Sequence, residues 1–243
     1  MPNAKNKLIV ALDVETADGA LALFEELRHV VGMFKIGSQL FTAAGPDIVR
    51  EIVAQGGKIF LDLKFHDIPN TVAAAGVEAT RLGVSIFNVH ASGGVEMMKR
   101  TADAVSETAV REGLERPKII AVTLLTSMDD QALGDIGINT AAKQLVTHTA
   151  RAAANSGLNG VVASPQEIEL IRAVVPQQPF LIVTPGIRSA NDAMDDQRRT
   201  MTAAEAVHAG ADYIVVGRPI IAAVDRVEAA RRIVVDMAAA LND

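Results

Sequence analysis

The sequence Lys58-Ile-Phe-Leu-Asp-Leu-Lys-Phe-His-Asp-Ile-Pro-Asn-Thr71 predicts a buried strand that leads into a helix. Its first part, Lys58–Phe65, is rich in Ile, Leu and Phe, as strands covered on both faces are. A helical segment, Thr71–Leu82, comes next, and a second apolar run, Ser85–Ala91, follows it. A strand, a helix and a further strand in this order form the unit from which parallel sheets are built.

The same alternation extends outward from this unit to both ends of the chain. Further strands are expected at Leu8–Val14, Met33–Gly37, Lys118–Thr126, Gly160–Ser164, Phe180–Thr184 and Tyr213–Gly217. Further helices are expected at Ala17–Val31, Pro46–Gln55, Gly94–Glu112, Thr140–Ser156, Gln166–Val174 and Val224–Leu241. Asp18 and Asp225 are the expected caps of the first and last of these helices.

The pattern contains eight strand–helix units with no change of composition and no linker between them. We therefore predict an α/β fold in which residues 1–243 form a single (β/α)8 TIM barrel. The alternative is a doubly wound open sheet, which normally carries a glycine-rich turn after its first strand. Here the first strand ends in Leu12-Asp-Val-Glu-Thr16, which has no glycine, so the barrel is favoured.

Composition excludes several classes of protein. The 243 residues include 23 Lys+Arg and 29 Asp+Glu, a net charge of −6, with 49% hydrophobic and 3% aromatic residues. These values argue against disorder and against a general nucleic-acid binder. The absence of Cys excludes disulfides and zinc–thiolate sites. No apolar run approaches the roughly 20 residues of a membrane span, and Leu8–Leu12 is too short for a secretory signal, so we expect a cytoplasmic protein without membrane or nucleic-acid partners.

In barrels of this type the active site lies at the carboxyl ends of the strands. Because side chains alternate along a strand, Asp62 and Lys64 share one face, and Lys35 comes from the neighbouring strand. Opposite charges on the inward face of a central strand are costly unless they are paired and hydrogen-bonded. That cost is the reason to suspect a functional site, although a purely structural ion pair is the alternative.

Other polar residues at strand ends also have two interpretations. Asp13, after the first strand, is either part of the site or a loop cap. Asp67 is either functional or a carboxylate that marks the entry to the next helix. His90 is as compatible with a hydrogen-bonded core histidine as with a ligand-binding one.

Two motifs near the C-terminus predict a phosphate site. Gly186-Ile-Arg188 follows the seventh strand and Gly217-Arg218 follows the eighth, which are the positions where barrels often hold phosphate. Glycines let backbone N–H groups approach an anion, and arginines add charge-assisted hydrogen bonds. Gln197, in the long polar stretch Gly186–Thr202, is a candidate to close over that anion as part of a lid.

At Asp62-Leu-Lys-Phe-His-Asp-Ile-Pro-Asn-Thr71 the chain resembles the bacterial form of the orotidine 5'-phosphate decarboxylase family. The Asp-x-Lys-x-x-Asp string also fits sugar-phosphate relatives on the same barrel, such as ketogulonate-phosphate decarboxylase. The His-Asp-Ile-Pro-Asn-Thr continuation and the Asp196-Gln-Arg198 loop favour the nucleotide enzymes. Further matching stretches are Ala11–Asp13, Phe34–Gly37, Asn88–Gly94, Leu125–Ser127, Val183–Arg188 and Val216–Pro219.

The resemblance implies decarboxylation of orotidine 5'-monophosphate to UMP, the last step of de novo pyrimidine synthesis, with no cofactor and no metal. It implies that Lys64 donates the proton to C6 of the pyrimidine and that Asp62 lies beside the departing carboxylate. Lys35 and Asp13 would contact the ribose and hold the charged array.

The resemblance further implies a homodimer with shared active sites, in which Asp67, Ile68 and Thr71 reach into the partner's site. Thr126 and Ser127 would contact the pyrimidine. The residues implied at the phosphate end are Pro185, Arg188, Gln197, Gly217 and Arg218. Two other functions remain open at this point, namely a metal-dependent sugar-phosphate decarboxylase or aldolase on the same barrel and a non-catalytic barrel that binds a phosphate ligand.

Overall fold

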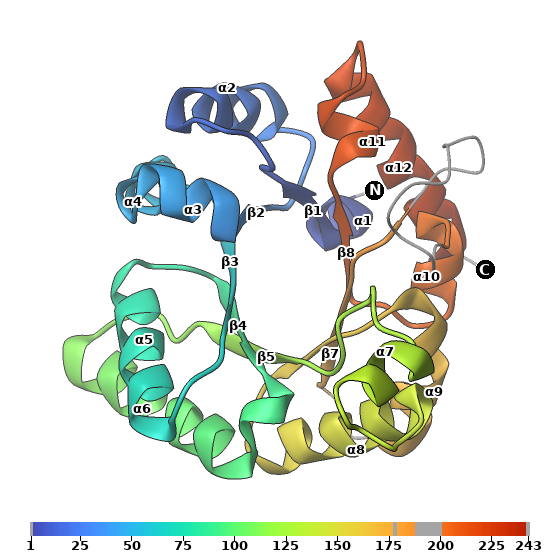
Figure 1. Cartoon of the computed structure of the whole chain (residues 1–243). Coiled ribbons are helices and arrows are strands. Elements are labelled where there is room, and N and C mark those ends of the chain that lie inside the picture. Colours follow the sequence, from blue (N-terminus) through green and yellow to red (C-terminus); the bar gives the residue numbers. More distant parts are fainter. Residues whose placement is uncertain (1, 177–178, 188–200, 242–243) are drawn as a thin grey trace.

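The computed structural model describes residues 2–176, 179–187 and 201–241. Eight parallel strands in this part of the chain form a closed barrel in chain order, with β8 pairing back onto β1 (Figure 1). The predicted barrel is confirmed and the open doubly wound sheet is wrong. The strands are β1 (Leu8–Ala11), β2 (Met33–Gly37), β3 (Ile59–Phe65), β4 (Ile86–His90), β5 (Lys118–Val122), β6 (Gly160–Val162), β7 (Leu181–Thr184) and β8 (Tyr213–Val216).

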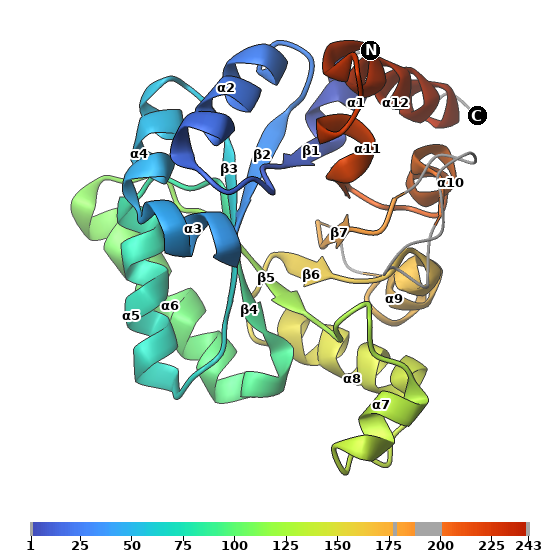
Figure 2. The same cartoon turned by 45° about the horizontal axis from the view of Figure 1, so that its top comes forward.

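Helices surround the outside of the barrel (Figures 1 and 2). They are α1 (Pro2–Lys7), α2 (Ala17–Leu27), α3 (Ser38–Ala44), α4 (Asp47–Ala54), α5 (Pro69–Arg81), α6 (Val95–Glu112), α7 (Asp130–Asp135), α8 (Ala142–Asn155), α9 (Ile168–Val174), α10 (Ala203–His208), α11 (Arg218–Ile221) and α12 (Arg226–Ala240). Two 3-10 turns lie at Ala91–Gly93 and Pro165–Glu167. None of the helices in the described residues is long and apolar enough to cross a bilayer.

The seven expected helices are present, and five short ones, α1, α3, α7, α10 and α11, are additional. The cap of α2 is Thr16, whose hydroxyl accepts from the Gly19 N–H at 3.2 Å, so the expectation for Asp18 is wrong. Asp225 caps α12 as predicted, accepting from the Glu228 N–H at 2.8 Å.

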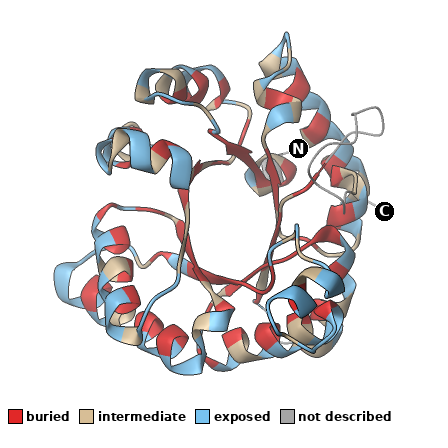
Figure 3. Cartoon of the chain, viewed as in Figure 1, coloured by how far each residue is buried: buried red, intermediate tan, exposed pale blue. Residues whose placement is uncertain are grey.

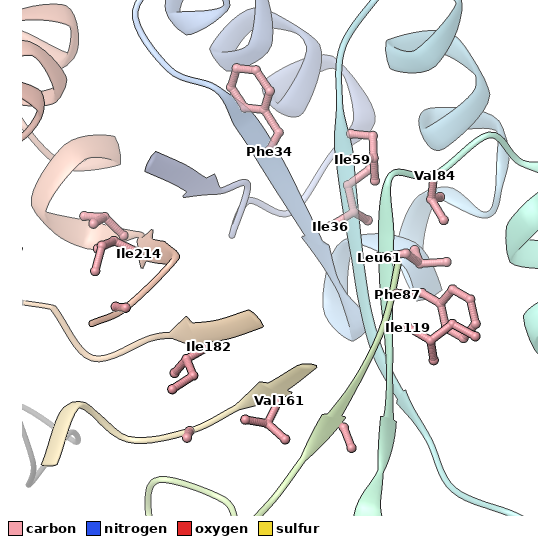
Figure 4. Packing of buried hydrophobic residues seen from close by; sticks show 14 of the residues in the cluster. Phe34, Ile36, Ile59, Leu61, Val84, Phe87, Ile119, Val161, Ile182 and Ile214 are labelled. Atoms are coloured by element: carbon pink, nitrogen blue, oxygen red, sulfur yellow. The ribbon is translucent and has the colours of Figure 1, made fainter. Parts of the chain in front are cut away.

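The apolar core has two layers, because alternate residues of each strand point into the barrel or out toward the helices. The outer layer lies between strands and helices (Figure 4), and most of the strand residues around the barrel are buried (Figure 3). The inner layer consists of Ile9, Ala11, Met33, Phe60, Ile86, Ile120, Val122, Val162, Val183 and Val215. The barrel interior is thus a packed core rather than a pore.

The inner layer determines where the polar residues lie. Two residues further along the chain from Ala11, Met33 and Phe60 are Asp13, just after β1, Lys35 in β2 and Asp62 in β3. These three strands are neighbours, with Ala11 paired to Lys35 and Gly37 paired to Asp62. The fold therefore brings charged groups from β1, β2 and β3 together on top of an apolar floor.

Candidate active site

A pocket opens at the carboxyl ends of the strands, as the fold class predicts. Eight of the residues expected from the sequence line it, namely Asp13, Lys35, Asp62, Lys64, Thr126, Pro185, Gly217 and Arg218. The apolar floor of the pocket is made by inner-layer residues that include Ala11, Phe60, Val162 and Val215. The pocket thus has one charged wall, from β1–β3, and a second polar wall, from the segments after β7 and β8.

The charged wall is an alternating chain of ammonium and carboxylate groups. Lys64 Nζ lies 2.7 Å from Asp62 Oδ1, and Lys35 Nζ lies 3.5 Å from Asp62 Oδ2. Lys35 Nζ also donates to Asp13 Oδ1 at 3.1 Å. The order across the wall is therefore Lys64, Asp62, Lys35 and Asp13, so that each interior member has opposite charges on both sides.

Burial differs along this chain of charges. The side chains of Asp62 and Lys35 are 13% and 12% exposed, whereas those of Lys64 and Asp13 are 36% and 53% exposed. The two central charges are the ones that depend most on their partners, because water compensates them least. The Lys64 ammonium is the accessible cation of the array and faces the pocket.

Asn88 of β4 supports this wall from the barrel interior. Its side chain is fully buried, its Nδ2 donates to Asp62 Oδ1 at 2.7 Å, and its Oδ1 accepts from the Lys64 N–H at 2.8 Å. Asn88 begins one of the stretches in which the sequence resembles the family, but the sequence predicts no role for it. The sequence feature that could have indicated a role is an amide in the otherwise apolar run Ile86-Phe-Asn-Val, because a buried amide needs hydrogen-bond partners.

The backbone at Lys64 has an unusual conformation. Among the described residues it is the one non-glycine residue with positive φ, at 53°. The pairing of β3 with β4 shifts between Leu61 and Phe65, so an irregularity in the strand surrounds this residue. Non-glycine residues rarely adopt this left-handed conformation, and it is enriched where strain serves a functional site.

The second polar wall lies beside a short helix. Gly217 precedes α11, and Arg218 and Pro219 begin it, so the predicted Gly217-Arg218 motif lies at the start of a short helix after the eighth strand. Pro185, Gly186 and Ile187 continue this wall after β7, and a β-bridge joins Ile187 to Met201. Arg188 and Gln197 lie outside the described residues.

The remaining predicted residues in the described part of the chain are not among those that line this pocket. Asp67 and Ile68 line a separate hollow with His66, Pro69, Ser92 and Gly93. The Asp67 carboxylate accepts from the Ile68 N–H at 2.6 Å, and Ile68 is 67% exposed. Thr71 and Ser127 are exposed and are not among the residues that line the main pocket.

His90 ends β4 close to the charged wall. Burial, more than any other influence, lowers the pKa of His90 below the ordinary value; the nearby His66 and Lys64 act in the same direction, and Asp62 acts against them. Its ring lies 5.2 Å from the ring of His66, measured between centroids. A neutral imidazole is thereby favoured next to the Lys64 ammonium, which avoids a second cation at this place.

A metal-dependent enzyme on the same barrel is one of the alternative functions that the sequence leaves open. Within residues 2–176, 179–187 and 201–241, no three His, Asp or Glu side chains gather in a group that could hold a metal ion. The carboxylates of the main pocket are instead engaged by lysines.

The closed barrel, its charged pocket and the glycine–arginine start of α11 define a barrel enzyme that acts on a small charged molecule. The chain belongs to the orotidine 5'-phosphate decarboxylase / HUMPS family, which it matches over residues 6–233.

Proteins named orotidine 5'-phosphate decarboxylase are similar to the chain over almost its whole length. The protein from Geotalea daltonii is 51% identical over 236 residues, 97% of this chain and 98% of the relative. That from Geobacter sulfurreducens is 52% identical over 230 residues, 95% of each chain. The crystal structure of the Lactobacillus acidophilus enzyme superposes with a TM-score of 0.83 at 36% identity, covering 95% of this chain and 98% of the other.

The left-handed conformation of Lys64 predicts an unusual order of stabilities. Lys64→Gly should be more stable than Lys64→Ala by about 1 kcal/mol, because glycine tolerates positive φ and alanine does not. Urea unfolding of both variants measures the difference, and both lack the ammonium. At Lys99, exposed in α6, the same pair should show the reverse order. An alanine variant at position 64 as stable as the glycine variant would contradict the conformation.

Proposed function

We propose that this chain decarboxylates orotidine 5'-monophosphate to UMP and CO2, as the final step in making the pyrimidine nucleotide. The observation that carries the proposal is the Lys64 ammonium, 2.7 Å from the Asp62 carboxylate and facing the pocket. The names of relatives at about half identity support the choice of substrate. We further propose that residues 1–243 work as one catalytic domain in the cytoplasm.

The reaction demands a cation at one place. When the bond between C6 and the carboxylate breaks, its electron pair stays on C6, in an orbital perpendicular to the ring π system. Resonance in the ring cannot spread that charge, so a fixed ammonium close to C6 is the group that stabilises it. The same ammonium then gives its proton to C6, which forms UMP and leaves a neutral amine that solvent protonates again.

The array keeps this ammonium in place before the substrate arrives. Asp62 holds Lys64 through a direct ion pair and lies beside the expected position of the departing carboxylate. Lys35 neutralises the other oxygen of Asp62, and with Asp13 it contacts the ribose. Preorganised charge of this kind avoids reorganisation at the moment of reaction.

The rest of the pocket recognises the nucleotide at its two ends. Thr126 and Ser127 contact the pyrimidine. Gly217 and Arg218, at the start of α11, bind the phosphate together with Pro185, Arg188 and Gln197. Because the phosphate is remote from C6, its binding energy can be used to close the site over the reacting carbon.

We propose a homodimer with shared sites as the working form. Asp67, Ile68 and Thr71 are exposed in the single chain and lie at the start of α5, apart from the main pocket. An isoleucine 67% exposed beside a hollow suits a surface that a second copy covers. In the dimer these residues complete the partner's site, with Asp67 next to the charged array.

The first test follows the loss of orotate absorbance with purified protein and orotidine 5'-monophosphate. The wild type should turn over equally well with and without EDTA, because the proposed chemistry uses an ammonium and no metal. Lys64→Ala should lower turnover by several orders of magnitude while the protein stays folded by circular dichroism. Loss of wild-type activity with EDTA, or a Lys64→Ala variant within about tenfold of wild type, would overturn the mechanism.

The phosphate assignment predicts a substrate-dependent effect of Arg218→Ala. Loss of a charge-assisted hydrogen bond, worth about 1.5–3 kcal/mol, should lower kcat/KM for the nucleotide roughly 10- to 100-fold. The value for orotidine, which lacks the phosphate, should change little. Arg231→Ala, at an exposed position of α12, serves as the control. Equal losses for both substrates would remove the phosphate role.

Shared sites predict complementation between two inactive variants. Lys64→Ala protomers retain Asp67, and Asp67→Ala protomers retain Lys64, so one site of each mixed dimer has both residues. After subunit exchange, an equimolar mixture should recover about a quarter of wild-type activity. A mixture that stays inactive, although exchange is shown by differently tagged chains, would place Asp67 in its own chain's site.

A further inference from the structure

Asn88 links two parts of β3 that the proposed mechanism needs in fixed positions. The neighbouring residues Phe87 and Val89 belong to the outer layer of the core, so alternation places Asn88 in the inward series with Ile86. Both ends of its amide are used on β3, at the Asp62 carboxylate and at the Lys64 backbone. The amide donates through its nitrogen and accepts through its oxygen, so one uncharged side chain makes both bonds.

The first bond concerns the backbone of Lys64. The Asn88 carbonyl oxygen accepts from the Lys64 N–H at 2.8 Å, at the residue with φ of 53° and within the shift of the β3–β4 register. A left-handed lysine is unfavourable by roughly 1–2 kcal/mol and persists where surrounding contacts hold it. This hydrogen bond, from a buried residue of the neighbouring strand, is such a contact.

The second bond concerns the orientation of Asp62. Asn88 Nδ2 and Lys64 Nζ both lie 2.7 Å from Oδ1, whereas Lys35 Nζ lies 3.5 Å from Oδ2. The amide therefore fixes which oxygen faces which lysine. Because Asn88 has no exposed surface, it acts through these neighbours and not on a substrate.

We propose that Asn88 is a positioning residue for the decarboxylation, which sets the place of the Lys64 ammonium by holding the Lys64 backbone and the Asp62 carboxylate together. The inference rests on the proposed function, since it assumes that Lys64 acts on the substrate. An aspartate at this position would present an oxygen to Asp62 where the amide donates, and an alanine would release both groups.

The test compares Asn88→Ala and the isosteric Asn88→Asp with Thr101→Val. Thr101 is also fully buried, but its hydroxyl donates to Met97 O, 2.8 Å away within α6, so this control removes a buried hydrogen bond between residues that do not line the pocket. Misplacement of a reacting group by about 1 Å lowers rate about 100-fold. We expect a kcat loss of that order for both Asn88 variants, UMP affinity within about threefold of wild type, and normal kcat for Thr101→Val.

Two results would overturn the proposal. One is an Asn88→Ala variant that folds and keeps kcat within about threefold of wild type. The other is a kcat loss of equal size in Thr101→Val, which would mark a general effect of destabilisation.

Crystal structures of the wild type and Asn88→Ala separate this proposal from the proposed function. We expect Lys64 to leave the positive-φ region, or its ammonium to leave Asp62, in the variant. Unchanged geometry at both residues would refute the positioning role even if the wild type did not decarboxylate the nucleotide. A wild type without that activity would refute the function, and the structures would still decide whether Asn88 positions Lys64.

Discussion

The carboxylate of Asp62, held between two ammonium groups, is the interaction on which the rest of the site depends. With 13% of its side chain exposed, Asp62 has little water to stabilise its charge, and it faces Lys64 on one oxygen and Lys35 on the other. Removing one partner of a buried ion pair typically costs about 3–5 kcal/mol. The two strands that supply these groups, β2 and β3, therefore have to pair in the correct register before the pocket forms.

In the barrel, the charged side chains form one layer and the apolar side chains that exclude water form another below it. Below the array, Phe60 and the other inner-layer residues exclude water. Above it, Lys64 keeps 36% of its side chain accessible. The low-polarity floor strengthens the interactions among the charges, and the open side leaves the ammonium available to a ligand. The residues that exclude water and the lysine that is open to a ligand thus lie at different depths along the same strands.

Much of this arrangement follows from the sequence, because it depends on periodicity. The alternation of apolar runs and helical segments predicts the barrel, and the two-residue repeat along β3 correctly predicts that Asp62 and Lys64 lie together. The short helix α3 could not be predicted in the same way. Ser38–Ala44 follows β2 without a break and has seven residues, too few to show a helical repeat.

The features of the site that the sequence does not predict depend on local deviations from regular strand geometry. The periodicity of the sequence does not show such deviations. Nothing in the composition of β3 indicates that Lys64 has positive φ, because lysine shows no preference for that region and no glycine marks the place. The role that we propose for Asn88 depends on the register between β3 and β4, which shifts at that point. A pattern within one strand carries no information about such a pairing.

The closed barrel also restricts how copies of the protein can associate. Every strand from β1 to β8 has neighbours on both sides, so the sheet has no free edge at which another chain could add a strand. Association must then use side chains of helices and loops, and its specificity comes from shape and charge and not from main-chain pairing. The segment with Asp67 and Ile68, which we propose completes the partner's site, is part of such a surface, so a substitution there would affect both assembly and reaction.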